Sequence, residues 1–149
     1  MSKLQSFLAL DGADRIATFE AMGLLLYARL LVAMVPPRRW RSRFGSIGCA
    51  SPQGGREAVD LGTVRRMRLA VMRALRHVPG APNCLPQALA ARWMLERRGI
   101  ASDLYIGTQR APGDHPRFHA WLKVGEEWVT GLCDEGEYAL FSTGDAEVA

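Results

Sequence analysis

The sequence contains few cysteines, and their number and spacing argue against a disulfide-stapled fold. Cys49, Cys84 and Cys133 are the only three among 149 residues, and none belongs to a Cys-x-x-Cys pair. An odd number of widely spaced cysteines is typical of a reducing compartment, in which thiols serve as core side chains or nucleophiles. We therefore expect a cytoplasmic protein. Because the cysteines and histidines form no close ligand pair, we expect neither a metal site nor a cofactor.

Lysine is also scarce, since Lys3 and Lys123 are the only two and nearly all other basic residues are arginines. Lysine and arginine together outnumber the acidic residues by 19 to 15, which gives a formal net charge of +4. This excess mildly favours an acidic partner and is too small to predict nucleic-acid binding. We therefore expect no nucleic-acid partner.

No apolar run is long enough to predict a transmembrane span. Residues 21–35 are strongly apolar, but Arg29 interrupts them and the run is shorter than the roughly 20 residues that cross a bilayer. The first residues show no signal-peptide pattern. We expect a single domain in which this run forms a buried or interfacial helix.

The order of the periodic patterns predicts helices first and strands afterwards. Helical spacing extends from Asp11 to Val35, where Pro36-Pro37 follows, and returns over 63–77 and 85–98. In the first of these helices the apolar residues that recur at helical spacing are Ile16, Phe19, Met22, Gly23, Leu26, Leu30, Ala33 and Met34. The period then changes to two, which predicts strands over 102–108, 118–124, 128–132 and 138–141. This order is typical of an α+β domain with helices packed on a small antiparallel sheet.

Cys84 and His119 stand in complementary local contexts. Cys84 lies at the N-terminal end of the predicted helix over 85–98, and His119 lies on the predicted strand over 118–124. A helix N-terminus and a nearby imidazolium both lower the pKa of a thiol, and backbone N–H groups of the first helical turn can stabilise an oxyanion. The pair predicts a nucleophilic Cys84 with His119 as general base and acid. The alternative is a buried, structural cysteine.

Four motifs that follow one another in the sequence resemble the transglutaminase-like cysteine peptidases of lasso-peptide biosynthesis. They are Cys-Leu-Pro-Gln-Ala-Leu-Ala at 84–90, Leu-Glu-Arg-Arg-Gly-Ile at 95–100, Leu-Tyr-Ile-Gly at 104–107 and Phe-His-Ala-Trp at 118–121. The resemblance covers about residues 60–131. It implies a papain-like or transglutaminase-like core over 58–149, preceded by an N-terminal helical segment and linker over 1–57.

This resemblance also implies an activity and partners. Cys84 would form a thioester with a ribosomally made precursor, with His119 moving the proton, and the leader peptide would be removed. We see no upstream leader-binding domain, so the resemblance implies a split form that needs a separate small leader-recognition protein. A lasso cyclase would act next. Asn83 and Trp121 are the residues that we expect to contact the substrate, although Trp121 could instead pack beneath the site.

The third catalytic residue departs from the family pattern, which places an aspartate about a dozen residues after the histidine. That position falls near Gly131, and Asp134 is the nearest carboxylate. We predict that Asp134 orients His119. A two-residue turn at 126–127 would place Asp134 opposite His119, a three-residue turn would place Cys133 there, and a bulge at Gly131 could shift either register. A backbone or amide acceptor is the remaining alternative.

Two other functions are compatible with the sequence. In an acyl transferase an amine would replace water as the group that releases the thioester. In a non-catalytic peptide-binding module the helix over 63–77 would hold an acidic peptide through its arginines, which otherwise form an ordinary solvated face. These arginines are Arg65, Arg66, Arg68, Arg73 and Arg76. The missing aspartate near Gly131 favours the binding module.

Overall fold

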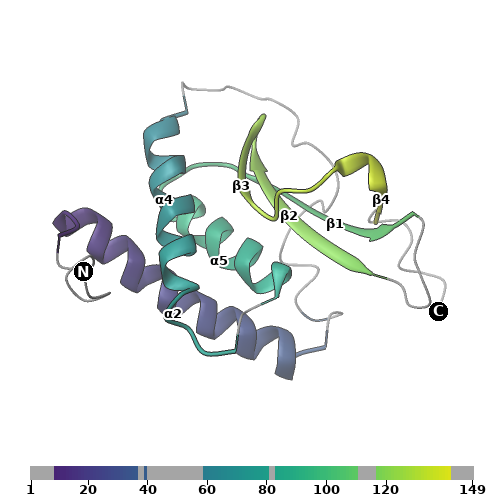
Figure 1. Ribbon diagram of the computed structural model, residues 1–149, viewed down its shortest axis with the longest axis horizontal. Coiled ribbons are helices and arrows are strands. Elements are labelled where there is room, and N and C mark those ends of the chain that lie inside the picture. The colour runs from purple at the N-terminus through teal and green to yellow at the C-terminus, as the bar shows by residue number, and fades with distance from the viewer. Residues whose placement is uncertain (1–8, 37–38, 40–58, 81–82, 111–116, 142–149) are drawn as a thin grey trace.

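The computed structural model describes residues 9–36, 39, 59–80, 83–110 and 117–141 (Figure 1). In these residues the helices come first and an antiparallel sheet follows, which confirms the predicted α+β fold. The elements in chain order are α2 (Gly12–Met34), α4 (Leu61–Ala74), α5 (Cys84–Glu96), β1 (Asp103–Gln109), β2 (Phe118–Val124), β3 (Glu127–Thr130), the 3-10 helix η1 (Glu135–Glu137) and β4 (Tyr138–Leu140). Cys49 lies outside the described residues.

The helix α2 packs mainly through small side chains, and Leu25 is its one large apolar residue that is fully buried. Asp11 caps it by accepting a hydrogen bond from the backbone N–H of Asp14, and it ends before the Pro36-Pro37 pair, which cannot continue a helix. Its buried residues are Ala17, Thr18, Ala21, Leu25 and Ala28. Small residues let the backbones of α4 and α5 approach closely, and α2 contacts both helices. Much of the apolar repeat noted in the sequence therefore lies on the solvent side of α2.

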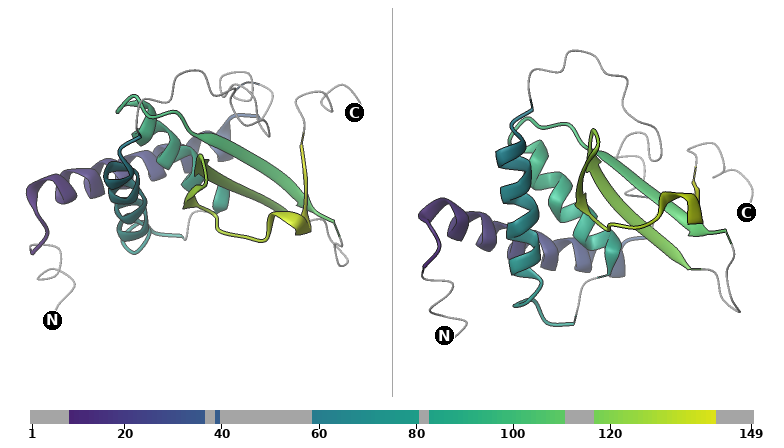
Figure 2. Two further views of the ribbon diagram at one scale, coloured as in Figure 1. Left: turned by 90° about the horizontal axis from the view of Figure 1, so that it is seen from above. Right: turned by 45° about the horizontal axis from the view of Figure 1, so that its top comes forward.

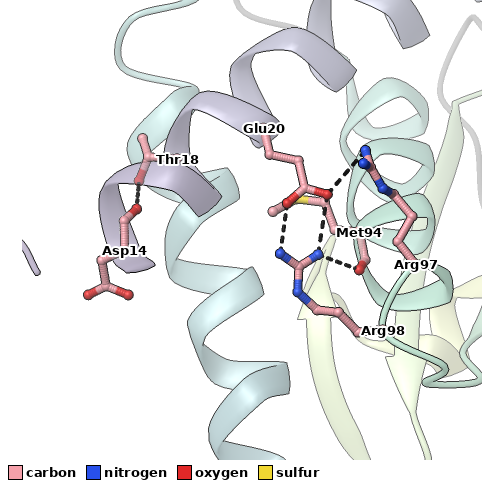
Figure 3. Close-up of polar contacts among 6 residues, drawn as sticks. All are labelled: Asp14, Thr18, Glu20, Met94, Arg97 and Arg98. Atoms are coloured by element: carbon pink, nitrogen blue, oxygen red, sulfur yellow. Dashed lines mark hydrogen bonds and ion pairs between the residues drawn. The ribbon is translucent and has the colours of Figure 1, made fainter. Parts of the chain in front are cut away.

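Ion pairs fix α2 to the other two helices along the edge of this packing. The carboxylate of Glu20 accepts hydrogen bonds from Arg98 at 3.2 and 2.7 Å, and Arg97 approaches it at 3.5 Å (Figure 3). Nearer the start of α2, the carboxylate of Asp14 pairs with Arg66 at 3.2 Å. These contacts join residues that are far apart in sequence, so they link α2 to α4 and to the end of α5.

By length and composition alone, α2 is long and apolar enough to cross a bilayer. It is longer than the run at 21–35 because the helix begins at Gly12 and includes the residues that precede the run. One side of α2 contributes to the core that it shares with α4 and α5.

The sheet has the order β3-β2-β1-β4, so β2 is a central strand. The helices gather on one side of this sheet (Figure 2). Strand β2 turns Ala120, Leu122 and Val124 toward the helices, where they join the main hydrophobic core. Successive side chains of a strand point to opposite faces, so His119 and Trp121 lie on the other face. Strand β2 therefore separates an apolar face from a face that carries polar and aromatic groups.

The hairpin between β2 and β3 has a different turn from both predicted ones, although beyond a bulge its pairing is that of the predicted three-residue turn. Val124 pairs with Glu127, so the two-residue turn is Gly125-Glu126 rather than the predicted 126–127, and Gly125 takes the positive φ of 59° that such a turn requires. Lys123 pairs with Trp128, but the next residue back along β2 pairs with Thr130. A bulge thus occurs before Gly131 rather than at it, and β3 ends at Thr130.

Candidate active site

Cys84 is the first residue of α5, as the sequence predicts. Asn83 precedes the helix in an extended conformation, its side chain makes no capping hydrogen bond, and it is exposed. Pro86 lies in the first turn, where a missing N–H costs no helical hydrogen bond. The thiol of Cys84 is partly buried and packs against the main core. It therefore lies beside backbone N–H groups at the positive end of the helix dipole.

His119 is the second residue of β2, and a backbone carbonyl holds its ring. The Nε2 atom lies 2.8 Å from the carbonyl oxygen of Gly131. A carbonyl oxygen can only accept a hydrogen bond, so Nε2 carries the proton in this contact. In the neutral ring Nδ1 is then the unprotonated nitrogen, which is the one able to accept a proton from a thiol.

Gly131 lies near the position at which the resemblance implies an aspartate, and the structure explains why a glycine stands there. Its φ is +73°, a backbone conformation that residues other than glycine rarely adopt. A Cβ at this position would lie 2.5 Å from the carbonyl oxygen of Ala120 and 2.9 Å from Trp121. The backbone thus supplies through its carbonyl the acceptor that a carboxylate supplies in the pattern.

Asp134 does not take the role predicted for it. Its carboxylate caps η1 by accepting a hydrogen bond from the N–H of Gly136 at 3.0 Å. The cause is the early end of β3, after which the chain turns into η1 instead of continuing alongside His119. The contact at Nε2 of His119 goes to Gly131, so the alternative of a backbone acceptor describes this structure.

Aromatic rings surround His119 on the face of the sheet that is turned away from the main core. Its ring stacks near Trp121, with centroids 5.9 Å apart, and lies 5.4 Å from the ring of Tyr138. Trp121 is 1% exposed and also stacks on Tyr105. It therefore packs beneath the histidine, which is the second of the two roles considered for it, and its buried ring is not a surface for substrate.

Cys84 and His119 are not joined by a hydrogen bond in the part of the chain that the structure describes. The N-terminal end of α5 and the first residues of β2 lie toward the same side of the molecule (Figures 1 and 2), and α5 packs against β2. However, the imidazole is directed to the aromatic face, whereas Cys84 packs with the core on the helix face. The predicted pairing of thiol and imidazole is therefore not seen as a hydrogen bond among the described residues, and it stays a prediction.

Cys133 is a thiol of a different kind. Burial raises its pKa, and the neighbouring carboxylates of Glu135, Asp134 and Glu137 raise it further. It therefore stays protonated at neutral pH and is a poor nucleophile. Among the described residues no group of three or more histidine, cysteine or acidic side chains could hold a metal ion.

A sequence model of the transglutaminase-like superfamily matches residues 28–143, which is most of the chain. The chain belongs to the transglutaminase-like superfamily. This superfamily covers cysteine peptidases and acyl transferases. No match was found among curated proteins or among solved structures.

Two residues that the sequence does not predict, Glu135 and Gly107, support the face of the sheet that carries His119. Glu135 accepts a hydrogen bond from Trp121 Nε1 at 2.9 Å and another from Lys123 Nζ at 3.2 Å, so it ties η1 to β2. Gly107 pairs with His119 in register, and a Cβ there would lie 3.1 Å from the Cβ of Tyr138. In the sequence, the glycine of the motif at 104–107 is the only sign of this arrangement. Its missing side chain leaves the space that Tyr138 occupies beside the imidazole.

Proposed function

We propose that this chain is a cysteine peptidase that removes the leader peptide from a ribosomally synthesised lasso-peptide precursor. The observation that carries the proposal is the position of Cys84 at the first residue of α5 in a transglutaminase-like domain. A thiol at a helix N-terminus is the group in this domain best suited to attack a peptide carbonyl. The four motifs that resemble leader peptidases supply the choice of substrate.

The proposed reaction has two steps. The Cys84 thiolate attacks the scissile carbonyl, the thiol proton passes to Nδ1 of His119, and that proton is then given to the leaving amine as a thioester forms. Water attacks the thioester, His119 accepts its proton, and the carboxylate product and the free thiol are released. Backbone N–H groups in the first turn of α5 would stabilise the oxyanion in both steps.

The geometry supports the proton-accepting role of His119 and sets a condition on it. The contact with Gly131 O leaves Nδ1 unprotonated in the neutral ring. Because no hydrogen bond joins Cys84 to this ring in the described residues, the proposal requires the two groups to meet when a peptide or a partner protein is bound. We propose a leader-recognition protein as that partner, with a cyclase acting next, all in the cytoplasm.

The arginines of α4 give little support to leader docking. Arg65 pairs with Glu127 at 3.2 Å, and Arg66 and Arg73 pair with Asp14 at 3.2 and 3.5 Å. These side chains tie α4 to β3 and to α2, so their charges are already partly neutralised. The alternative of docking an acidic peptide on this face would have to break such pairs.

A second function, a peptide-binding module that lacks catalysis, is favoured by two observations. The thiol is not hydrogen-bonded to the imidazole among the described residues, and Gly131 stands near the position at which the resemblance implies an aspartate. The peptidase and the binding module therefore predict different results for one measurable quantity. This quantity is the change in Cys84 reactivity when His119 is removed.

The first test measures alkylation rate against pH in a Cys49→Ser, Cys133→Ser background, so that Cys84 is the only thiol. In the presence of the precursor peptide and its recognition protein, we expect the labelling of Cys84 to slow at least about tenfold in His119→Ala, because the imidazole is then in place to accept the thiol proton. The matched control is His77→Ala, an exposed histidine near the end of α4. Labelling that follows an ordinary thiol in both variants, with and without the precursor peptide, would favour the binding module.

The second test separates hydrolysis from transfer. A candidate precursor peptide is incubated with the chain and its recognition protein, with and without a primary amine, and the products are weighed by mass spectrometry. Peptide-bond hydrolysis gives two fragments whose masses together exceed the precursor by one water, whereas transfer gives an acyl product that carries the amine. An amine adduct as the main product would replace the peptidase proposal by the acyl transferase.

A further inference from the structure

The side of α2 that faces away from the core carries a continuous apolar surface, which we call the α2 ridge. Five large side chains on it are exposed, with exposed fractions between 44 and 77%. They are Ile16, Phe19, Leu26, Leu30 and Met34, whereas the exposed Tyr27 leans back onto Trp93 of α5. Single exposed apolar residues are ordinary on a protein surface, but a run of them along five turns of one helix is not. A helix that is apolar on both sides is normally covered on both sides.

The spacing along the α2 ridge is that of a helix that pairs with another helix. Positions 16, 19, 23, 26, 30 and 33 alternate in steps of three and four, which is the 3.5-residue period of a coiled-coil seam. Every one of these positions is exposed and none carries a charged or polar side chain. All positions of this narrow seam lie on α2, so the apolar surface is formed by this one helix.

We propose that the α2 ridge is the interface of a homodimer in which two α2 helices pack antiparallel. In that arrangement the seam complements itself, since each bulky position meets a smaller or matching one on the second copy. Ile16 lies opposite Ala33, Phe19 opposite Leu30, and Gly23 opposite Leu26. The two-fold axis passes between residues 24 and 25, so the same surface serves both copies, as a two-fold dimer requires.

Gly23 is a second observation that supports the antiparallel pairing. It stands in the middle of α2, where glycine weakens a helix relative to alanine. A Cβ built on it meets nothing within 4 Å, so packing inside the domain does not explain the glycine. Close approach of another helix backbone at the centre of the ridge does explain it, because Leu26 of the second copy needs the space that a side chain would fill.

The amount of surface also suits a second copy. The exposed parts of the five large side chains amount to roughly 600 Å² per copy, most of the roughly 800 Å² that each partner contributes to a standard interface. A lipid surface is less well matched, because the flanking Arg29 donates a hydrogen bond to the carbonyl of Pro79 instead of extending toward headgroups. Membrane binding is therefore an outcome of the test that would overturn the proposal.

The test is sedimentation equilibrium of the wild type, Leu30→Glu and Leu69→Glu. Leu69 is the matched control because it is an exposed leucine on α4, away from the ridge. We expect the wild type and Leu69→Glu to dimerise with a similar dissociation constant, and Leu30→Glu to weaken the dimer at least about a hundredfold. Circular dichroism checks that each variant is folded.

A cross-linking experiment tests the orientation without relying on a disruptive variant. In a background with Cys49, Cys84 and Cys133 replaced by serine, Ile16→Cys is mixed with Ala33→Cys and oxidised. Antiparallel packing gives mixed dimers of the two variants in preference to dimers of either one. A wild type that stays monomeric to about 100 µM, or that is recovered as a monomer on anionic vesicles, overturns the proposal. Dimers of Ile16→Cys alone overturn the antiparallel arrangement.

Discussion

The two faces of β2 are stabilised in different ways. On the helix face, Ala120 and Leu122 belong to the same apolar core as Ala88 and Ala91 of α5, and such contacts are not directional. On the other face, the side chains are held by a carbonyl, stacked rings and a carboxylate with two partners. Apolar burial gives most of the stability of a domain, whereas directional contacts fix where a ring points. The helix face therefore holds the fold, and the aromatic face holds the imidazole of His119.

Gly131→Asp gives the largest expected effect. It puts a carboxylate near the position at which the resemblance implies one, but it imposes a positive φ on a residue that has a Cβ and places that Cβ 2.5 Å from the carbonyl oxygen of Ala120. We expect a loss of about 4 kcal/mol or more in the free energy of unfolding, measured by urea denaturation. Gly99→Asp is the matched control, because Gly99 has a φ of 69° but open space around it, and we expect a loss of about 1 kcal/mol there. Equal losses would show that strain alone, and not the clash, excludes an aspartate.

Glu20→Ala tests the polar contacts at the edge of the helix face. The side chain of Glu20 is 14% exposed and binds Arg98 through both oxygens. Its removal should cost about 2 kcal/mol, because a partly buried guanidinium loses charge-assisted hydrogen bonds. Glu96→Ala removes the more exposed pair with Arg92 within α5 and should cost about 0.5 kcal/mol or less. Chemical denaturation measures both. If the two costs are alike, the contacts of α2 with α5 do not depend on Glu20.

Glu135→Gln tests the aromatic face. The amide keeps one acceptor for Trp121 Nε1 but loses the ion pair with Lys123, so we expect about 1 kcal/mol of destabilisation. The expected signature is local: the NMR resonances of the His119 ring shift while those of Leu122, on the helix face, stay in place. Asp134→Asn is the control, because it keeps an acceptor for the cap of η1 and leaves the His119 contact intact. Equal shifts at His119 in both variants would mean that η1 as a whole, rather than Glu135, positions the ring.

The pH dependence of Cys133 is the smallest effect. Its pKa is raised by burial and by the carboxylates of Glu135, Asp134 and Glu137. The thiol therefore keeps its proton to a higher pH than an ordinary thiol does, and its alkylation should become fast only at a higher pH than that of a free cysteine. The measurement uses a Cys49→Ser, Cys84→Ala background. A Cys133 that labels rapidly at pH 7 would contradict the assigned environment.

The sequence predicted those features that local signals determine. The start of α5 at Cys84 follows from a proline in its first turn, and the end of its predicted span follows from Gly99, whose positive φ is typical of a helix C-terminal cap. The strand around His119 follows from a period of two. The acceptor for His119 could not be assigned to Gly131, because a carbonyl is present at every residue and leaves no mark in the sequence. The buried side of α2 was hidden for another reason: both of its sides are apolar, and periodicity does not tell which one packs inside the domain.

The carbonyl at Gly131 has a consequence for genetics. An alanine scan removes side chains, so it detects a catalytic carboxylate but is blind to an acceptor that belongs to the main chain. In such a scan position 131 would register as a glycine required for folding, and the hydrogen bond to His119 would go unrecorded. A carbonyl also has no proton to gain in the physiological range, so acid that would silence an aspartate leaves this acceptor unchanged.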